Sequence, residues 1–142
     1  MRASNIHVAL LLLLALVASE PSHAFDLVPK FHVNVFNDLS NNTLYLHCQS
    51  KDDDLGNQEL MQNKHFHFQF RINWKRTTLF WCHFAWGNFR GGTYNVFWAK
   101  KNLVAKCDYD YKHCNWSERD DGLYLQNYAR HAEWVKYYDW KH

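Results

Sequence analysis

The chain has 142 residues, a formal net charge of +2 and an aromatic content of 18%. That length suits one domain, and the near-neutral charge excludes a strongly basic surface for nucleic acid. The aromatic content excludes intrinsic disorder. Because the chain has only 5 glycines and no short repeat, collagen-like and low-complexity classes are excluded as well. A small globular domain remains.

The amino-terminal segment has the features of a secretory signal peptide. Arg2 provides a short positive region, and residues 8–18 are almost wholly apolar. This run is shorter than the roughly 20 apolar residues that a membrane-spanning helix needs. Ser22-His23-Ala24 has the small-x-small form of a cleavage site. We therefore expect residues 1–24 to be removed and residues 25–142 to form one secreted domain, without membrane insertion.

The cysteines fit an oxidising compartment. They are Cys48, Cys82, Cys107 and Cys114. An even number of cysteines in a secreted chain predicts two disulfides, and the lack of a C-x₂-C or C-x₄-C pair argues against zinc. Three pairings are possible. We favour Cys48 with Cys114 and Cys82 with Cys107, both of which would join distant parts of the chain.

Two N-glycosylation sequons are present, one beginning at Asn41 and the other at Asn115. Asn41 belongs to a polar turn, 37–42, where a glycan would be solvated. Asn115 is next to Cys114 and is followed by the bulky Trp116, so we expect poor use of this sequon. Asn41 is the better candidate.

Between residues 31 and 98 the hydrophobic pattern has a period of two, which predicts strands. The clearest strand is 65–72, and the run 78–86 is apolar on both faces, which predicts a central strand covered on both sides. A hairpin-type break at Gly87 and Gly91-Gly92 precedes a strand at 93–99. Further strands are expected around 33–35, 44–48, 103–105, 115–117, 123–128 and 134–140.

Short strands separated by turns predict an all-β fold, a small antiparallel β-sandwich held by two disulfides. At 127–138 an amphipathic helix is the alternative to a strand. A domain of this size must bury large side chains, so we assign the clustered aromatic residues to the core. They are Phe66, Phe68, Phe70, Phe80, Phe84 and Trp116.

Histidines raise the question of a metal site. His65 and His67 share one face of the predicted strand, and His83 could lie on the neighbouring strand. Histidines at i and i+2 can chelate zinc or copper, but this pattern is equally typical of a solvent-facing side. We therefore predict no metal site and no cofactor.

Three consecutive acids, Asp52, Asp53 and Asp54, form a second polar cluster. Their spacing does not match an EF-hand calcium loop. A solvated turn between strands, with Gly56 at positive φ, accounts for the segment.

No motif indicates catalysis. The chain has no G-x-S-x-G, H-E-x-x-H or phosphate-binding loop, and two disulfides leave no cysteine as a nucleophile. A His/Lys acid–base pair could be assembled in many ways and therefore has no specificity. We predict no catalytic residues.

Four blocks in order carry a resemblance to a known family. They are LYLHCQSKDDDLG at 44–56, FHFQF at 66–70, TTLFWCHFAW at 77–86, and CNW at 114–116 with DGLY at 121–124. Together they resemble the plant self-incompatibility proteins, the stigmatic S-proteins and their homologues, from about residue 32 to 140. The chain departs from the family pattern at Lys100-Lys101-Asn102, where an Arg-Asp pair is expected.

The resemblance implies a small secreted plant protein with a disulfide-linked β-sandwich and no enzymatic activity. It implies an extracellular, monomeric ligand that a cell-surface protein receptor recognises, and not a partner of nucleic acid. The charged loop carrying Asp52, Asp53 and Asp54 is our candidate for the contact. A glycan- or wall-binding module using exposed Trp and Tyr, and a small secreted hydrolase or toxin using histidines, are the alternatives.

Overall fold

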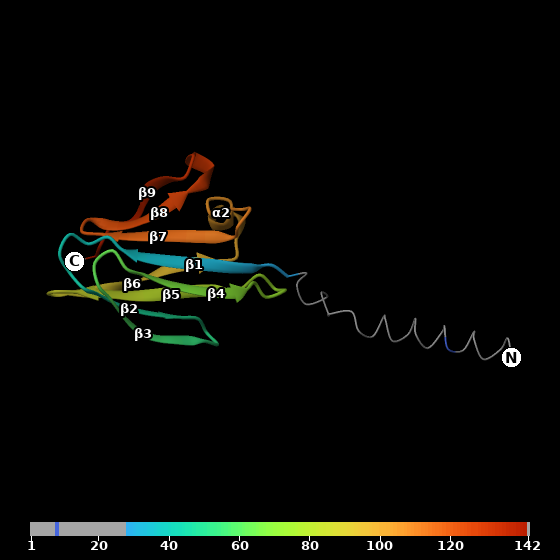
Figure 1. Cartoon of the computed structure of the whole chain (residues 1–142), viewed down its shortest axis with the longest axis horizontal. Helices are drawn as coiled ribbons and strands as arrows, with labels where there is room; N and C mark the ends of the chain where they lie inside the picture. The colour runs from blue at the N-terminus through green and yellow to red at the C-terminus, as the bar shows by residue number, and fades with distance from the viewer. Residues whose placement is uncertain (1–7, 9–27, 142) are drawn as a thin grey trace.

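The computed structural model describes Val8 and residues 28–141. The predicted cleavage site, and residues 1–24 apart from Val8, lie outside this part. The described chain forms two stacked layers of strands with the core between them (Figure 1). Its elements are β1 Lys30–Asn37, β2 Leu44–Gln49, β3 Asp54–Leu60, β4 His65–Arg71, β5 Leu79–Trp86, β6 Phe89–Trp98, α2 Lys101–Val104, β7 His113–Arg119, β8 Gly122–Asn127, η2 Tyr128–Arg130 and β9 Glu133–Tyr138.

One sheet has the strand order β4-β1-β7-β8-β9, and the other has the order β3-β2-β5-β6. The all-β sandwich with two disulfides is thus confirmed. All neighbouring strands in the described sheets are antiparallel except β1 and β7, which are parallel. Parallel neighbours need a long connection, and here β2 to β6 and α2 lie between them in the chain.

Alternation along the strands places apolar side chains inside. In β2, Leu44, Leu46 and Cys48 are buried while Tyr45 is exposed. The assigned core aromatics are confirmed in position: four are buried, and Phe66 and Phe70 are partly buried and pack against the core. The period-two pattern is a direct consequence of side chains pointing to opposite faces of a strand.

Two buried tryptophans bind the layers together through their ring nitrogens. Trp116 of β7 donates to the carbonyl of Val96 in the opposite sheet at 2.8 Å, and Trp140 donates to the carbonyl of Arg119 at 2.8 Å. A buried indole N–H without an acceptor would be costly, so these bonds let large side chains fill the core.

The predicted disulfide pairing is wrong. The bonds join Cys48 to Cys82 and Cys107 to Cys114, with Cα–Cα distances of 4.0 Å and 4.7 Å. Cys48 and Cys82 lie directly opposite each other on the neighbouring strands β2 and β5. Cys114 belongs to the other sheet, and stacked sheets lie about 10 Å apart, farther than the roughly 7 Å between Cα atoms that a disulfide can bridge. The predicted bond between Cys48 and Cys114 therefore fails on geometry.

The break after β5 lies earlier than predicted. The β5–β6 turn is at Gly87 and Asn88, while Gly91 and Gly92 lie within β6. Gly91 has φ +79°, and a Cβ there would lie 1.5 Å from the carbonyl oxygen of Phe84. The pair therefore marks an irregularity in the β5–β6 register, where only glycine permits the close approach.

Two strand predictions also need correction. Residues 103–105 are not a strand: α2 ends there, with Leu103 fully buried. β5 is central between β2 and β6, as predicted, but its outer face is not covered, because Leu79 and His83 are exposed. At 127–138 the strand prediction is confirmed for β9, and only the short η2 turn is helical.

Candidate recognition surface

Three of the connections that meet at one end of the sandwich form the candidate surface (Figure 1). β2, β4 and β6 all run toward this end, and β3, β5 and β7 start from it. We call it the loop end and define it by residues 50–53, 72–78 and 99–112. The predicted Asp52-Asp53-Asp54 segment falls here, at the β2–β3 connection.

The β2–β3 turn is held by two hydrogen bonds between Ser50 and Asp53. The Ser50 N–H donates to the Asp53 carbonyl at 2.7 Å, and the Asp53 N–H donates to the Ser50 hydroxyl at 3.1 Å. Gly56 has φ +76°, as predicted. The turn is shorter than the predicted loop, because β3 already begins at Asp54.

The three acids have different surroundings. Asp54 Oδ1 lies 2.5 Å from His47 Nε2 and accepts the Gly56 N–H at 2.9 Å. The bond with His47, and then the bond from Gly56, holds the pKa of Asp54 below its usual range. Asp52 and Asp53 are exposed, and their side chains have no partner among the described residues. Asp52 and Asp53 can therefore bind another molecule without breaking a side-chain hydrogen bond within the described fold.

The β4–β5 loop presents a tryptophan. Asn73 exchanges bonds with Thr77, accepting its N–H at 2.8 Å and donating to its hydroxyl at 2.8 Å, which ties the loop ends together. Trp74 at the tip is 88% exposed, with the Lys75 ammonium 5.3 Å from its ring centroid. Because these hydrogen bonds already order the loop, little conformational entropy would be lost when a partner binds the exposed Trp74 ring.

The 99–112 segment presents two tyrosines. The bond between Cys107 and Cys114 closes it, and the Asp108 carboxylate accepts the Asp110 and Tyr111 N–H groups. Tyr109 and Tyr111 are 70% and 74% exposed. The Lys112 ammonium lies 3.5 Å from the Tyr109 ring centroid. Sequence reasoning missed Trp74 and both tyrosines, because an aromatic residue in a short polar run does not reveal its own exposure.

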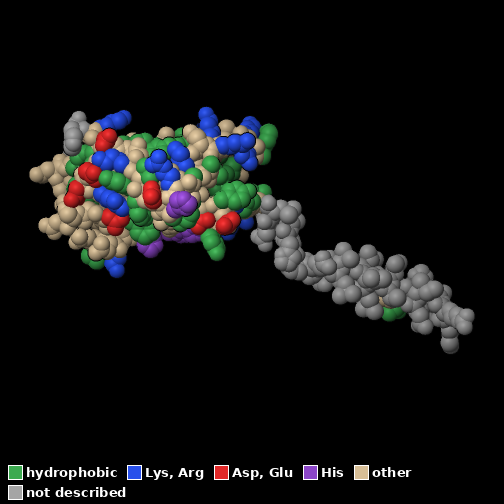
Figure 2. All heavy atoms as spheres, turned by 90° about the horizontal axis from the view of Figure 1, so that it is seen from above, with side chains coloured by type: hydrophobic (Ala, Val, Ile, Leu, Met, Phe, Trp, Pro, Cys, Tyr) green, Lys and Arg blue, Asp and Glu red, His purple; other side chains and the backbone are tan. Residues whose placement is uncertain are grey.

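Charge and apolar surface are combined at the loop end. Figure 2 shows basic and hydrophobic side chains side by side at the end where β1 begins. A hollow of about 610 Å³ separates the β2–β3 turn from the β4–β5 loop and is lined by Asp52, Asp53, Lys75 and Trp81 among others. The arrangement suits a partner with complementary charge and an apolar anchor point.

The histidines group differently from the prediction. His83 lies in the other sheet, and β4 pairs with β1 instead of β5. His32 of β1 stacks between His67 and His113, at ring distances of 5.1 Å and 4.5 Å. Desolvation, and then neighbouring positive charge, lowers the pKa of His32 and His67. The three histidines come together because β1 pairs with β4 on one side and with β7 on the other. Such pairing of distant strands cannot be predicted from a local sequence pattern.

No group of three or more His, Cys, Asp or Glu side chains suited to a metal ion occurs in the described part of the chain. The described cysteines are all in disulfides. His47 and Asp54 form an acid–base type pair. This pair joins β2 to β3 on an outer face of the sandwich, which explains it as a contact between neighbouring strands.

The two sequons have different environments. Asn41 is exposed in the β1–β2 connection, at the end opposite the loop end. Asn115 is part of a polar network, since its Nδ2 donates to Gln126 at 2.9 Å and its Oδ1 accepts from Asn34 at 2.8 Å. A glycan on Asn115 would break that network, so the preference for Asn41 stays our prediction.

Glu118 of β7 is a second residue that the sequence did not reveal. It is fully buried, and neither carboxyl oxygen has a hydrogen-bond partner in the described structure. Desolvation raises its pKa to about 9. The acid therefore stays protonated at neutral pH.

No helix in the described part of the chain has the length and apolar character to cross a membrane.

The sequence profile of the plant self-incompatibility protein S1 family matches residues 32–140. S-protein homolog 1 of Arabidopsis thaliana is 39% identical over 107 residues, which are 72% of this chain and 69% of that protein. S-protein homolog 29 of the same plant is 39% identical over 123 residues, 84% of each chain.

A solved structure of an SPH, or self-incompatibility protein homologue, has the same fold. It superimposes with a TM-score of 0.60 at 18% identity, covering 81% of this chain and 97% of that one. That protein comes from a widespread family described as small, highly stable, secreted proteins from plants. The family profile, the relatives and the shared fold agree, and the chain belongs to the plant self-incompatibility protein S1 family.

Proposed function

We propose that the chain is a secreted plant protein that acts as an extracellular recognition ligand for a cell-surface protein receptor, without catalysis. The loop end is its contact surface. Secretion is supported by the description of the homologous family and by the paired cysteines, since disulfides persist in oxidising compartments. The predicted signal peptide 1–24 and the mature domain 25–142 belong to this proposal.

The observation that carries the proposal is the exposure of three aromatic side chains on braced loops at one end. Trp74, Tyr109 and Tyr111 are each at least 70% exposed. Exposed aromatic residues are enriched where proteins bind other proteins, and Trp and Tyr dominate the energetics of such interfaces. Asp52 and Asp53 border the same surface and provide charges that can select a partner.

The test is binding of the labelled protein to intact plant cells. A receptor predicts a saturable component of binding that unlabelled protein displaces and that mild protease treatment of the cells abolishes. The absence of any protease-sensitive component, with all binding lost after digestion of cell-surface glycans, would contradict a protein receptor and favour a wall-binding module. Hydrolysis of a substrate by the purified protein, lost on His47→Ala substitution, would contradict the absence of catalysis.

A further inference from the structure

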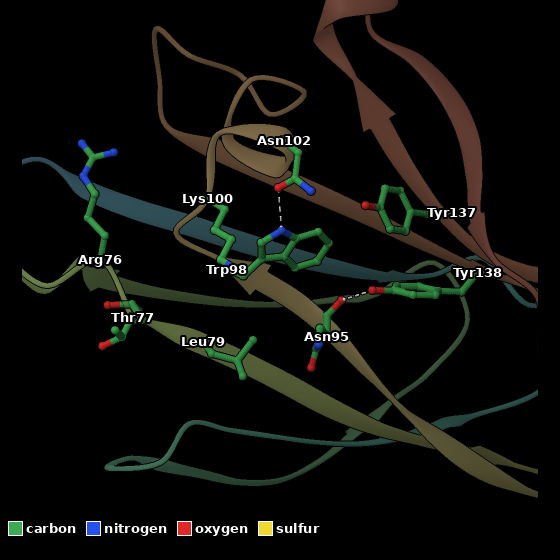
Figure 3. A pocket seen from close by; sticks show the side chains of 10 residues that line it. Arg76, Thr77, Leu79, Asn95, Trp98, Lys100, Asn102, Tyr137 and Tyr138 are labelled. Atoms are coloured by element: carbon green, nitrogen blue, oxygen red, sulfur yellow. Dashed lines mark hydrogen bonds between the residues drawn. The ribbon is translucent and has the colours of Figure 1, made fainter.

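A groove at the loop end lies between the edges of the two sheets. It is formed by β6 of one sheet, β9 of the other and the start of β5, and it has a volume of about 590 Å³ (Figure 3). This groove adjoins the hollow beside Asp52 and Asp53, since Thr77, Thr78 and Leu79 line both. A ligand held in this groove is distinct from the receptor proposed above.

Aromatic rings from both sheets line the groove. Trp98 and Tyr137 are half-buried, with ring centroids 5.8 Å apart. The Trp98 ring nitrogen donates to Asn102 Oδ1 at 2.9 Å. Because the amide oxygen is occupied by this bond, the Asn102 amide nitrogen remains as a donor (Figure 3). Flat apolar rings beside amide groups suit the ring faces and hydroxyls of a sugar.

The charged side chains that line the groove are all positive. Arg76 and Lys100 line the groove, and no Asp or Glu does so among the described residues. Neither cation has an ion pair within the described chain. Arg76 also lines a neighbouring hollow of about 430 Å³ together with Lys101 and Lys112, so the positive surface continues beyond the groove. Unpaired cations of this kind favour an anionic ligand, and arginine binds carboxylates in a bidentate manner.

An extended peptide is a poorer fit. Peptides commonly bind an open sheet edge by adding a strand. Here the Tyr138 hydroxyl donates to the Asn95 carbonyl at 3.1 Å, which occupies the edge of β6. Strand addition along β6 would have to displace the Tyr138 side chain.

From these contacts we propose that the groove binds a carboxylate-bearing polysaccharide, a polymer of uronic acid residues. Sugar rings stack on Trp98 and Tyr137, and hydroxyls bond the exposed amides of Asn95 and Asn102. Carboxylates pair with Lys100 and, at the rim of the groove, with Arg76, whose guanidinium points away from the two rings (Figure 3). The ligand is held without covalent chemistry.

The test measures binding of purified full-length mature protein to oligogalacturonate by calorimetry. We expect measurable affinity for the acidic oligomer and none for a neutral galactan of the same length. Arg76→Gln with Lys100→Gln should weaken binding about tenfold or more. The matched control is Lys64→Gln with Lys141→Gln, which removes the same charge from exposed positions outside the groove and should change affinity less than about twofold. Both double variants should keep the melting temperature, since all four side chains are exposed.

Three results would overturn the proposal. The first is the lack of binding to oligogalacturonate. The second is an equal loss of affinity in the control variant, which would show general charge attraction. The third is equal or tighter binding of poly-glutamate, which would identify an acidic peptide as the ligand. Because cells and receptors are not needed, failure here leaves the cell-binding test of the proposed function unaffected.

Discussion

Glu118 shows how a single buried group sets the pH response of the domain. Its carboxyl is removed from water without a compensating hydrogen bond among the described residues. Such a group is tolerated in its neutral form, because burying the charged form would cost several kcal/mol. The folded chain therefore keeps a proton that the unfolded chain releases at an ordinary carboxyl pKa.

We predict that the free energy of unfolding declines from mildly acidic to alkaline pH. The pKa of Glu118 rises from 4.5 to about 9 on burial. The folded state binds the Glu118 proton more tightly than the unfolded state does. The contribution of this proton to the free energy of unfolding is therefore complete below about pH 4.5 and is lost as the pH approaches about 9. Urea unfolding across this range should show a decline in the wild type that Glu118→Gln largely removes. Parallel pH profiles of the two proteins would contradict this explanation.

Asp53 and Asp54 should respond differently to substitution. Asp54→Ala removes the contacts with His47 and with the Gly56 N–H, so we expect a lower melting temperature. Asp53→Asn keeps the backbone bonds of the turn and should leave the melting temperature unchanged, while weakening cell binding through the lost charge. Thermal melts and the cell-binding assay measure the two effects. Equal loss of stability in both variants would contradict the recognition role of the turn.

Among the structural elements, the two disulfides should contribute unequally. The chain-entropy relation gives about 4 kcal/mol for the bond between Cys48 and Cys82, which spans 34 residues. It gives about 2.5 kcal/mol for the bond between Cys107 and Cys114, which spans 7 residues. Chemical unfolding of the two paired Cys→Ala variants tests this order. A larger loss for the Cys107 and Cys114 pair would contradict it.

Sequence patterns predicted individual strands well because side-chain alternation is local. β4 and β2 could be identified from Phe66 to Phe70 and from Leu44 to Cys48, since every second side chain of each strand packs in or against the core. The same reasoning could not place Leu103, whose burial depends on α2 docking against the sandwich. Periodicity does not specify the contacts of a four-residue helix.

Pairing between distant strands was beyond sequence reasoning. The Cys48–Cys82 bond and the row of His32, His67 and His113 both depend on which strands are neighbours. The candidate surface was found in part, through Asp52 and Asp53. Trp74, Tyr109 and Tyr111 were missed because an aromatic residue in a short polar run is indistinguishable from a core residue until its exposure is known.

At the scale of the whole molecule, the sandwich separates stability from recognition. The core, the Cys48–Cys82 bond and the tryptophan bonds lie within the body, whereas the proposed contact residues lie on loops at one end. Asn41 is at the opposite end, so a glycan there would leave the loop end free. Exposed loop residues such as Trp74, Tyr109 and Tyr111 can therefore change without disturbing the fold.

The most direct test of the proposed contact surface is cell binding by the triple variant Trp74→Ala, Tyr109→Ala and Tyr111→Ala. Tyr45→Ala is the matched control, since Tyr45 is 52% exposed on β2 and lies outside the loop end. We predict that the triple variant keeps its melting temperature and loses at least about 2 kcal/mol of binding free energy, roughly a thirtyfold weaker affinity, while the control binds normally. Normal binding by a folded triple variant, or an equal loss in the control, would contradict the assignment of the loop end as the recognition surface.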